Sequence, residues 1–129
     1  MSDDLSVPRH LRYTEEHEWV FSEDDVVTVG LTDYAQDSLG ELVYIELPEV
    51  GREISKGDEI AVVESCKAAS DVYAPISGTI VEVNELLTDS PSMVNESPYE
   101  EGWLVKIEPN EEGEMEELLT ASDYKAHTQ

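Results

Sequence analysis

Short apolar segments separated by turn residues run through the middle of the chain, and they constrain its fold more than any other feature. The clearest is segment 42–47, which alternates between two faces as a half-buried strand does before Pro48 ends it. Because the connections are turns and not helical crossovers, the spacing predicts antiparallel sheets. Similar β-branched segments, each bounded by turn residues, lie at 26–30, 60–64, 72–74, 79–83 and 103–109.

Helical spacing occurs in two other stretches. In 31–39 the apolar residues fall on one face and a glycine follows, so a helix of about two turns is predicted. The apolar residues of 115–119 also follow helical spacing, and another turn is expected at 123–127. We predict that 84–102 is mainly loop, with a short helix near 85–87 as the alternative.

The charge of the chain excludes several classes of function. Its 31 Asp and Glu residues against 7 Lys and Arg give a formal net charge of −24. Nucleic acids and anionic membranes both attract basic patches, so neither is expected as a partner. Leu, Ile, Val and Phe make up about a quarter of the residues, which is enough for a folded core. Since salt screens repulsion between carboxylates, the composition predicts a halophilic protein that KCl stabilises.

The chain shows no sign of an oxidising compartment or of a membrane. Cys66 is the single cysteine, so neither a disulfide within the chain nor a site built on several cysteines can form. The N-terminus lacks the basic start and apolar run of a signal peptide, and no apolar run of about 18 residues occurs. We therefore expect a cytoplasmic protein, with a flexible leader at 1–9 and a single domain at 10–129.

Lys67 is the most informative residue of the sequence. It lies in SCKAAS, a break of small residues between two strand segments, so it is predicted at or beside the tip of a β-hairpin. Most surface lysines only aid solubility. In a chain with so few basic residues, however, an exposed lysine between small neighbours indicates a site that an enzyme can reach and modify by forming an amide.

The run GDEIAVVESCKAASDVYAPISG resembles the attachment loop of lipoyl and biotinyl carrier domains. The resemblance narrows to the glycine cleavage system H-protein family, because HEWV at 17–20, the stretch 29–51 and NESPYEEGWLVKI at 95–107 follow that family's pattern in order. Biotin is disfavoured, because biotin carriers place methionine on both sides of their lysine. The fold that the resemblance implies is mostly β, a barrel-sandwich hybrid of two small antiparallel sheets with a few short peripheral helices, including a C-terminal one.

By this resemblance, Lys67 carries covalently attached lipoate and the protein is a non-catalytic carrier. Its lipoyl arm would take the aminomethyl group of glycine from the pyridoxal-phosphate-dependent P protein to the T protein, which uses tetrahydrofolate, and the L protein would reoxidise the arm. A lipoate ligase or lipoyl transferase would attach the group. Transient visits to several enzymes suit a monomer. The alternatives are an H-like lipoyl donor or relay for other complexes, and an acidic binding protein that is never modified.

The resemblance also implies a cleft in which acidic groups meet the ammonium of the loaded arm. Glu18 and Asp71 occupy the matching positions, and Glu16 stands where a small hydroxyl residue is common, so it would add charge. Cys66 stands where an aliphatic residue is common and is expected to pack as a small apolar side chain. His17 is expected to orient the cleft or to pack beside Trp19.

Two other groups of residues have no assigned chemistry. The acidic run 111–117 is interpreted as the solvent face of a helix, or as a patch that helps partners dock. No metal site is predicted, because the three histidines are too widely spaced for a metal-binding motif: His10, His17 and His127.

Overall fold

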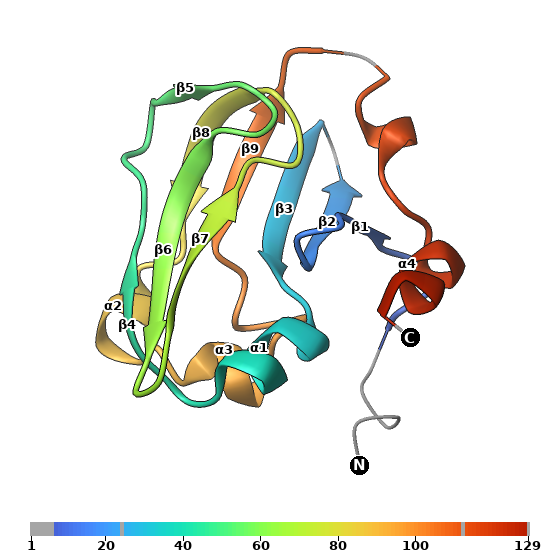
Figure 1. The fold of residues 1–129 in the computed structure, drawn as a ribbon. Coiled ribbons are helices and arrows are strands. Elements are labelled where there is room, and N and C mark those ends of the chain that lie inside the picture. The colour runs from blue at the N-terminus through green and yellow to red at the C-terminus, as the bar shows by residue number, and fades with distance from the viewer. Residues whose placement is uncertain (1–6, 24, 112, 129) are drawn as a thin grey trace.

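The computed structural model describes residues 7–23, 25–111 and 113–128, which form two antiparallel sheets with short helices around them (Figure 1). The larger sheet has the order β1-β2-β3-β9-β8-β5, and the smaller has the order β4-β6-β7. This confirms the predicted mostly β sandwich of two small antiparallel sheets. The strands are β1 Arg12–Tyr13, β2 Glu18–Glu23, β3 Val26–Leu31, β4 Leu42–Glu46, β5 Glu53–Ile54, β6 Glu59–Ser65, β7 Ala69–Tyr73, β8 Gly78–Val83 and β9 Val105–Pro109.

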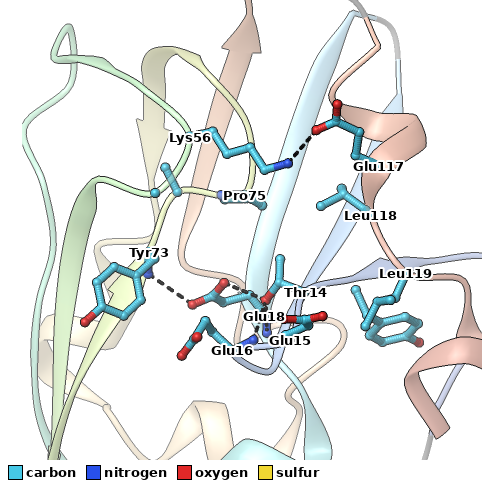
Figure 2. Close-up of a pocket in the computed structure, with 13 residues that line it drawn as sticks. Thr14, Glu15, Glu16, Glu18, Lys56, Tyr73, Pro75, Glu117, Leu118 and Leu119 are labelled. Carbon is cyan, nitrogen blue, oxygen red and sulfur yellow. Dashed lines mark hydrogen bonds and ion pairs between the residues drawn. The ribbon is translucent and has the colours of Figure 1, made fainter. Parts of the chain in front are cut away.

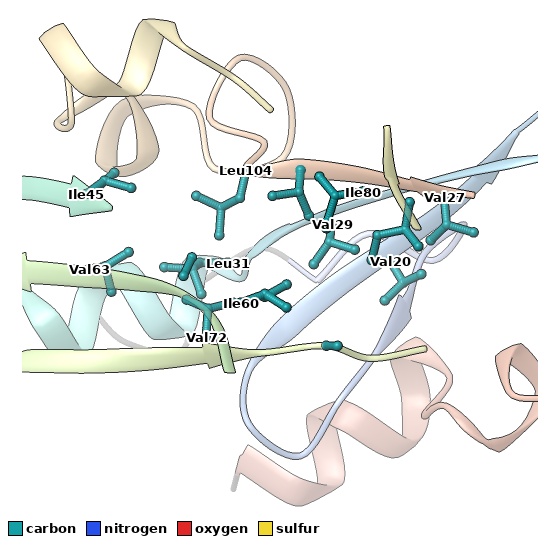
Figure 3. Close-up of a cluster of buried hydrophobic side chains, with 14 of the residues drawn as sticks. Val20, Val27, Val29, Leu31, Ile45, Ile60, Val63, Val72, Ile80 and Leu104 are labelled. Carbon is teal, nitrogen blue, oxygen red and sulfur yellow. The ribbon is translucent and has the colours of Figure 1, made fainter. Parts of the chain in front are cut away.

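The main core lies between the two sheets (Figure 3). Val29 and Ile80 point inward from the larger sheet and Val63 from the smaller one, and each is completely buried. A second, smaller cluster holds the C-terminal helix against β1 and β2. Its centre is a stacked pair, Tyr13 and Tyr124, with ring centroids 4.7 Å apart. The main core thus holds the hairpin β6–β7 against the larger sheet, and the second cluster holds α4 against β1 and β2.

The helices are short and lie at the margins of the sheets. They are α1 Asp33–Leu39, α2 Leu86–Asp89, α3 Met93–Glu96, the 3-10 turn η2 Met115–Glu117 and α4 Ala121–Thr128. The helix predicted at 31–39 is confirmed as α1. Thr32 caps its start by accepting a hydrogen bond from the backbone N–H of Ala35 at 3.1 Å, and Gly40 ends it at φ 85°. The alternative of a short helix near 85–87 is confirmed by α2.

The alternation predicted for segment 42–47 is only partly correct. A β-bulge between Leu42 and Tyr44 places two residues of β4 opposite one residue of β6. As a result Val43 and Tyr44 are both exposed, whereas strict alternation would have turned one of them toward the core. No glycine or turn residue within 42–46 marks the position of this bulge.

The helix predicted through 115–119 is wrong in its position. Only a single 3-10 turn forms there, because the chain becomes extended at Leu118 and Leu119 then exchanges two backbone hydrogen bonds of 2.8 Å with Tyr13. The true C-terminal helix is α4, whose first turn follows Thr120 and which includes the turn expected at 123–127.

The N-terminal segment that the sequence presents as a flexible leader is described only from Val7. Val7 packs against the second cluster, and the Tyr13 hydroxyl donates a hydrogen bond to the carbonyl of Pro8. Residues 1–6 lie outside the described part, so the flexibility of 1–9 stays a prediction. Among the described helices, none has the length and apolar character needed to cross a bilayer.

Candidate functional site

Lys67 lies in the β-hairpin turn that joins β6 to β7, as the sequence predicts. Ser65 closes this turn: its backbone N–H donates to the Ala68 carbonyl at 2.7 Å, and its hydroxyl accepts from the Ala68 N–H at 3.1 Å. The Lys67 side chain is exposed. Figure 1 shows the hairpin tip at the end of the sandwich where α1, α2 and α3 gather. The lysine is therefore held on a short, closed turn and is open to solvent.

Cys66 is exposed in the same turn, so the expectation that it packs as a small apolar side chain is wrong. Cys66 belongs to neither of the two hydrophobic clusters. The small residues of SCKAAS therefore leave the Lys67 side chain accessible and do not contribute to the core.

A cavity of about 490 Å³ opens between β7 and the turn that joins β1 to β2 (Figure 2). The C-terminal segment around Leu118 forms its third wall. On the outer side, the Nζ of Lys56 lies 2.7 Å from a carboxylate oxygen of Glu117. The cavity is thus built from four parts of the chain that are far apart in sequence, and the sequence predicted only its acidic wall. Its lining comprises Tyr13, Thr14, Glu15, Glu16, Glu18, Lys56, Gly57, Tyr73, Ala74, Pro75, Glu117, Leu118 and Leu119.

Glu18 is the one buried carboxylate of the described chain, with 1% of its surface exposed. One of its oxygens accepts a hydrogen bond of 2.7 Å from the Thr14 hydroxyl, and the other accepts one of 3.0 Å from the backbone N–H of Tyr73. Burial raises the pKa of Glu18 to about 7, although these two hydrogen bonds oppose the rise. Glu18 therefore links β2 to β7 across the back of the cavity and titrates near neutral pH.

Glu16 and Asp71 take different places. Glu16 is exposed on the cavity wall, and its charge contributes to the raised pKa of Glu18. Asp71 is exposed on β7 and is absent from the described residues that line the cavity, as is Lys67. A carboxylate oxygen of Asp71 lies 3.5 Å from the Tyr73 hydroxyl, and Asp71 raises the pKa of Glu59 on the neighbouring strand. The structure thus brings Glu16 and Glu18 together and leaves Asp71 on the strand between Lys67 and the cavity.

His17 supports the wall of the cavity from behind. Its backbone has φ 73°, its Nδ1 lies 2.8 Å from the Tyr124 hydroxyl, and its ring stacks on Tyr34 with centroids 4.6 Å apart. Burial, with the nearby His127, lowers its pKa. The expectation that His17 orients the cleft fits these contacts, whereas its described ring partners do not include Trp19.

Several site residues were not found by sequence reasoning. Tyr124 contacts His17 from 107 positions away in sequence, and the Tyr73 contribution comes from its backbone, so no side-chain pattern could reveal either. Lys56 could have been singled out from the sequence, because the chain has only 7 Lys and Arg residues. The acidic run 111–117 also does more than face solvent: Glu114 accepts hydrogen bonds from the backbone N–H and hydroxyl of Ser77 at 2.6 and 2.9 Å.

Comparison with known proteins identifies the family. The model of the family described as glycine cleavage H-protein matches residues 11–129. The chain belongs to the glycine cleavage H-protein family. The glycine cleavage system H protein of Alcanivorax borkumensis is 58% identical over 93% of this chain and 94% of its own length. That of Thermus thermophilus is 53% identical over 94% of each chain.

The structural comparison agrees with this family. The crystal structure of a glycine cleavage system H protein from Mycobacterium marinum has a TM-score of 0.88 and 42% identity, and the match covers 95% of this chain and 98% of that one. H-proteins are the lipoyl carriers of the glycine cleavage system, and this chain is one of them. As such it takes the aminomethyl group of glycine from the P protein to the T protein, and the L protein reoxidises it.

Proposed function

We propose that Lys67 is the residue that carries the lipoyl group, as an amide on its Nζ, and that the chain acts without catalysing any step itself. The observation that carries this proposal is the exposure of Lys67 on a closed hairpin turn of small residues. An acylating enzyme can reach such an amine without unfolding any part of the carrier. The lipoyl group supplies the dithiolane on which the one-carbon unit travels, and that chemistry is the cofactor's.

The cavity is proposed as the resting place of the loaded arm. β7 runs from the Lys67 turn to Tyr73 at the cavity, and Asp71 lies on the way. A cation that leaves water needs an opposite charge and hydrogen-bond acceptors. The carboxylates of Glu16 and Glu18 would supply the negative charge and the hydrogen-bond acceptors at the cavity. A cation beside Glu18 would favour its ionised form. The carrier would thereby shield the bound group between visits to its partners.

The partners follow from this role. The P, T and L proteins would each meet the arm in turn, and a lipoate ligase or lipoyl transferase would attach the group to Lys67. A flexible tether keeps its end at a high effective concentration around the carrier, so the individual contacts can be weak and the carrier can be a monomer.

The intact mass of the protein tests the attachment. Protein made in cells that synthesise lipoate should be heavier than its sequence by one lipoyl group, and Lys67→Ala should lose this increment completely. Lys125→Ala is the matched control, because Lys125 is also exposed and should leave the increment unchanged. An increment that survives in Lys67→Ala would refute the proposal.

Activity measurements separate the carrier from a lipoyl relay. Lipoylated protein added to purified P, T and L proteins should restore glycine-dependent release of carbon dioxide, and lipoylated Lys125→Ala should do the same. Protein with the correct mass but no effect on glycine cleavage would favour the relay.

A further inference from the structure

The strand next to the Lys67 turn exposes an unusual amount of apolar surface. Val43 is 53% exposed and Tyr44 50% exposed, and both lie on β4, one of the two edge strands of the small sheet. Leu86 on the adjoining helix α2 is 62% exposed. Single exposed apolar residues are common, but neighbouring ones on a strand edge indicate a surface that another molecule covers.

The bulge in β4 is what creates this surface. Leu42 pairs with Ser65 and Tyr44 pairs with Glu64, so Val43 is the extra residue between two registered pairs. Without the bulge, Val43 and Tyr44 would face opposite sides of the sheet. A local irregularity of this kind redirects side chains at a strand edge.

The apolar pair lies close to the lysine. Ser65, the partner of Leu42, is the residue that closes the Lys67 turn. The Lys67 side chain reaches back toward the entry to β4, because its Cε lies 3.5 Å from where a Cβ on Gly40 would be. Lys67 and the pair Val43 and Tyr44 therefore belong to one end of the same small sheet.

We propose that Val43 and Tyr44 form a docking surface for the enzyme that acylates Lys67. The proposal rests on the attachment of the lipoyl group to Lys67. In the acylation, the Nζ of Lys67 attacks the carbonyl carbon of an activated acyl donor such as an acyl adenylate. The new C–N bond forms, the C–O bond to the phosphate breaks, AMP leaves and the amine releases a proton. Before this step there is no arm, so the enzyme must approach the hairpin itself, whereas enzymes that act on the dithiolane meet it at the far end of the arm.

The surroundings of the pair define the chemistry of the partner. Three exposed carboxylates flank the apolar pair: Glu41 just before β4, Glu46 at the end of β4, and Glu64 on β6 opposite Tyr44. A complementary surface would have an apolar pocket for the tyrosine and valine side chains, with Lys or Arg at its rim. Salt screens the charged contacts but leaves the apolar ones. The apolar pair would therefore supply the part of the affinity that persists at high salt.

Acylation kinetics test the proposal. The substrate is the unmodified protein, and the probe is a purified lipoate–protein ligase with lipoate and ATP. The double variant Val43→Ser with Tyr44→Ser should raise the KM for the carrier about tenfold, with kcat little changed, because exposed apolar contacts contribute binding and not chemistry. Val50→Ser is the matched control, because Val50 is 60% exposed but lies outside β4, in the connection that leads to β5. The KM for the Val50→Ser carrier should stay within about twofold of the wild-type value.

The outcomes are distinguishable. A wild-type KM in the double variant, with Lys67 acylated normally, would overturn the docking surface and leave the proposed function intact. A normal ligase KM combined with impaired glycine decarboxylation by the lipoylated double variant would assign the surface to the P protein, and it would also overturn the proposal. Failure of the ligase to modify Lys67 in the wild-type chain would refute the proposed function itself. Circular dichroism of the double variant should match the wild type, since neither residue is in the core.

Discussion

Glu18 combines two roles that conflict at the residue scale. Its carboxylate is 1% exposed, yet it lines the cavity and receives hydrogen bonds from Thr14 and the Tyr73 backbone. Two hydrogen bonds do not fully replace water around an ionised carboxylate, which is why burial raises its pKa to about 7. Keeping this carboxylate ionised in the buried position therefore costs the protein stability at neutral pH.

The pH dependence of stability measures this cost. A pKa raised from about 4.5 to about 7 means that Glu18 stabilises the fold fully below pH 4.5 and that this contribution is lost as pH rises to 7. Glu18→Gln keeps the shape and the acceptor for Tyr73 but cannot ionise. We expect the variant to exceed the wild type by on the order of 2 kcal/mol in the free energy of unfolding at pH 8, and by much less at pH 5.

Urea denaturation at both pH values gives this comparison. Glu15→Gln is the control, because Glu15 lines the same cavity but is exposed, so its effect should stay within about 0.5 kcal/mol at either pH. An advantage of Glu18→Gln that does not change between pH 5 and pH 8 would contradict the raised pKa.

Gly30 carries a second residue-scale constraint. It pairs with Trp19 across β2 and β3, and a Cβ at Gly30 would lie 2.6 Å from the indole ring. The ring cannot move freely, because its Nε1 donates to the Pro98 carbonyl at 2.8 Å and it is almost fully buried. Gly30→Ala should therefore destabilise the protein by about 2–3 kcal/mol in thermal or urea denaturation.

Gly51→Ala is the comparison for Gly30→Ala. Gly51 has φ 98° and open space around its Cα, so only backbone strain of about 1 kcal/mol is expected there. Equal losses at the two glycines would show that the indole ring adjusts, against the expectation.

At the scale of elements, the side chain of Asn95 connects three elements at the end of the sandwich that carries Lys67. From α3, its side chain accepts from the Leu42 N–H at 2.9 Å and donates to the Gly40 carbonyl and to Gln36, each at 2.9 Å. One amide group thus joins α3, the end of α1 and the start of β4.

Asn95→Ala should leave the Leu42 N–H and the Gly40 carbonyl without their partner. We expect a loss of about 2–3 kcal/mol in the free energy of unfolding, together with faster hydrogen exchange at the Leu42 amide. Asn110→Ala, at a backbone-bonded site outside any helix or strand interior, is the control and should cost less than about 0.5 kcal/mol. Protected exchange at Leu42 in Asn95→Ala would contradict this role.

Elements with a local cause were predictable from the sequence, and those with a distant cause were not. The hairpin around Lys67 and helix α1 depend on neighbouring residues, such as the Thr32 cap, so their patterns were sufficient. The 3-10 turn at 115–117 and the position of α4 depend on pairing between Leu119 and Tyr13, more than a hundred positions apart. The family pattern pointed to Glu18, but its burial and its Tyr73 partner follow only from the packing of β2 against β7.

At the scale of the whole molecule, the net charge of −24 is hardly compensated by contacts. In the described residues, ion pairs between side chains are limited to Lys56 with Glu117 at 2.7 Å and Lys106 with Glu82 at 3.9 Å. All four side chains are at least about one-third exposed, so each pair contributes little. Repulsion among the remaining carboxylates therefore opposes the compact state.

Salt should relieve this repulsion, because the Debye length falls from about 10 Å at 0.1 M to about 3 Å at 1 M. We expect the Tm to rise by more than roughly 5 °C between 0.1 and 2 M KCl, in calorimetry at constant pH. A triple variant, with Gln replacing the exposed Glu41, Glu85 and Glu101, has a net charge three units less negative and should show a smaller rise. A neutral osmolyte at matched osmolality should not distinguish the two proteins, since it screens no charge. A Tm that does not change with KCl would mean that repulsion between the surface carboxylates contributes little to stability. The predicted halophilic adaptation would then be wrong.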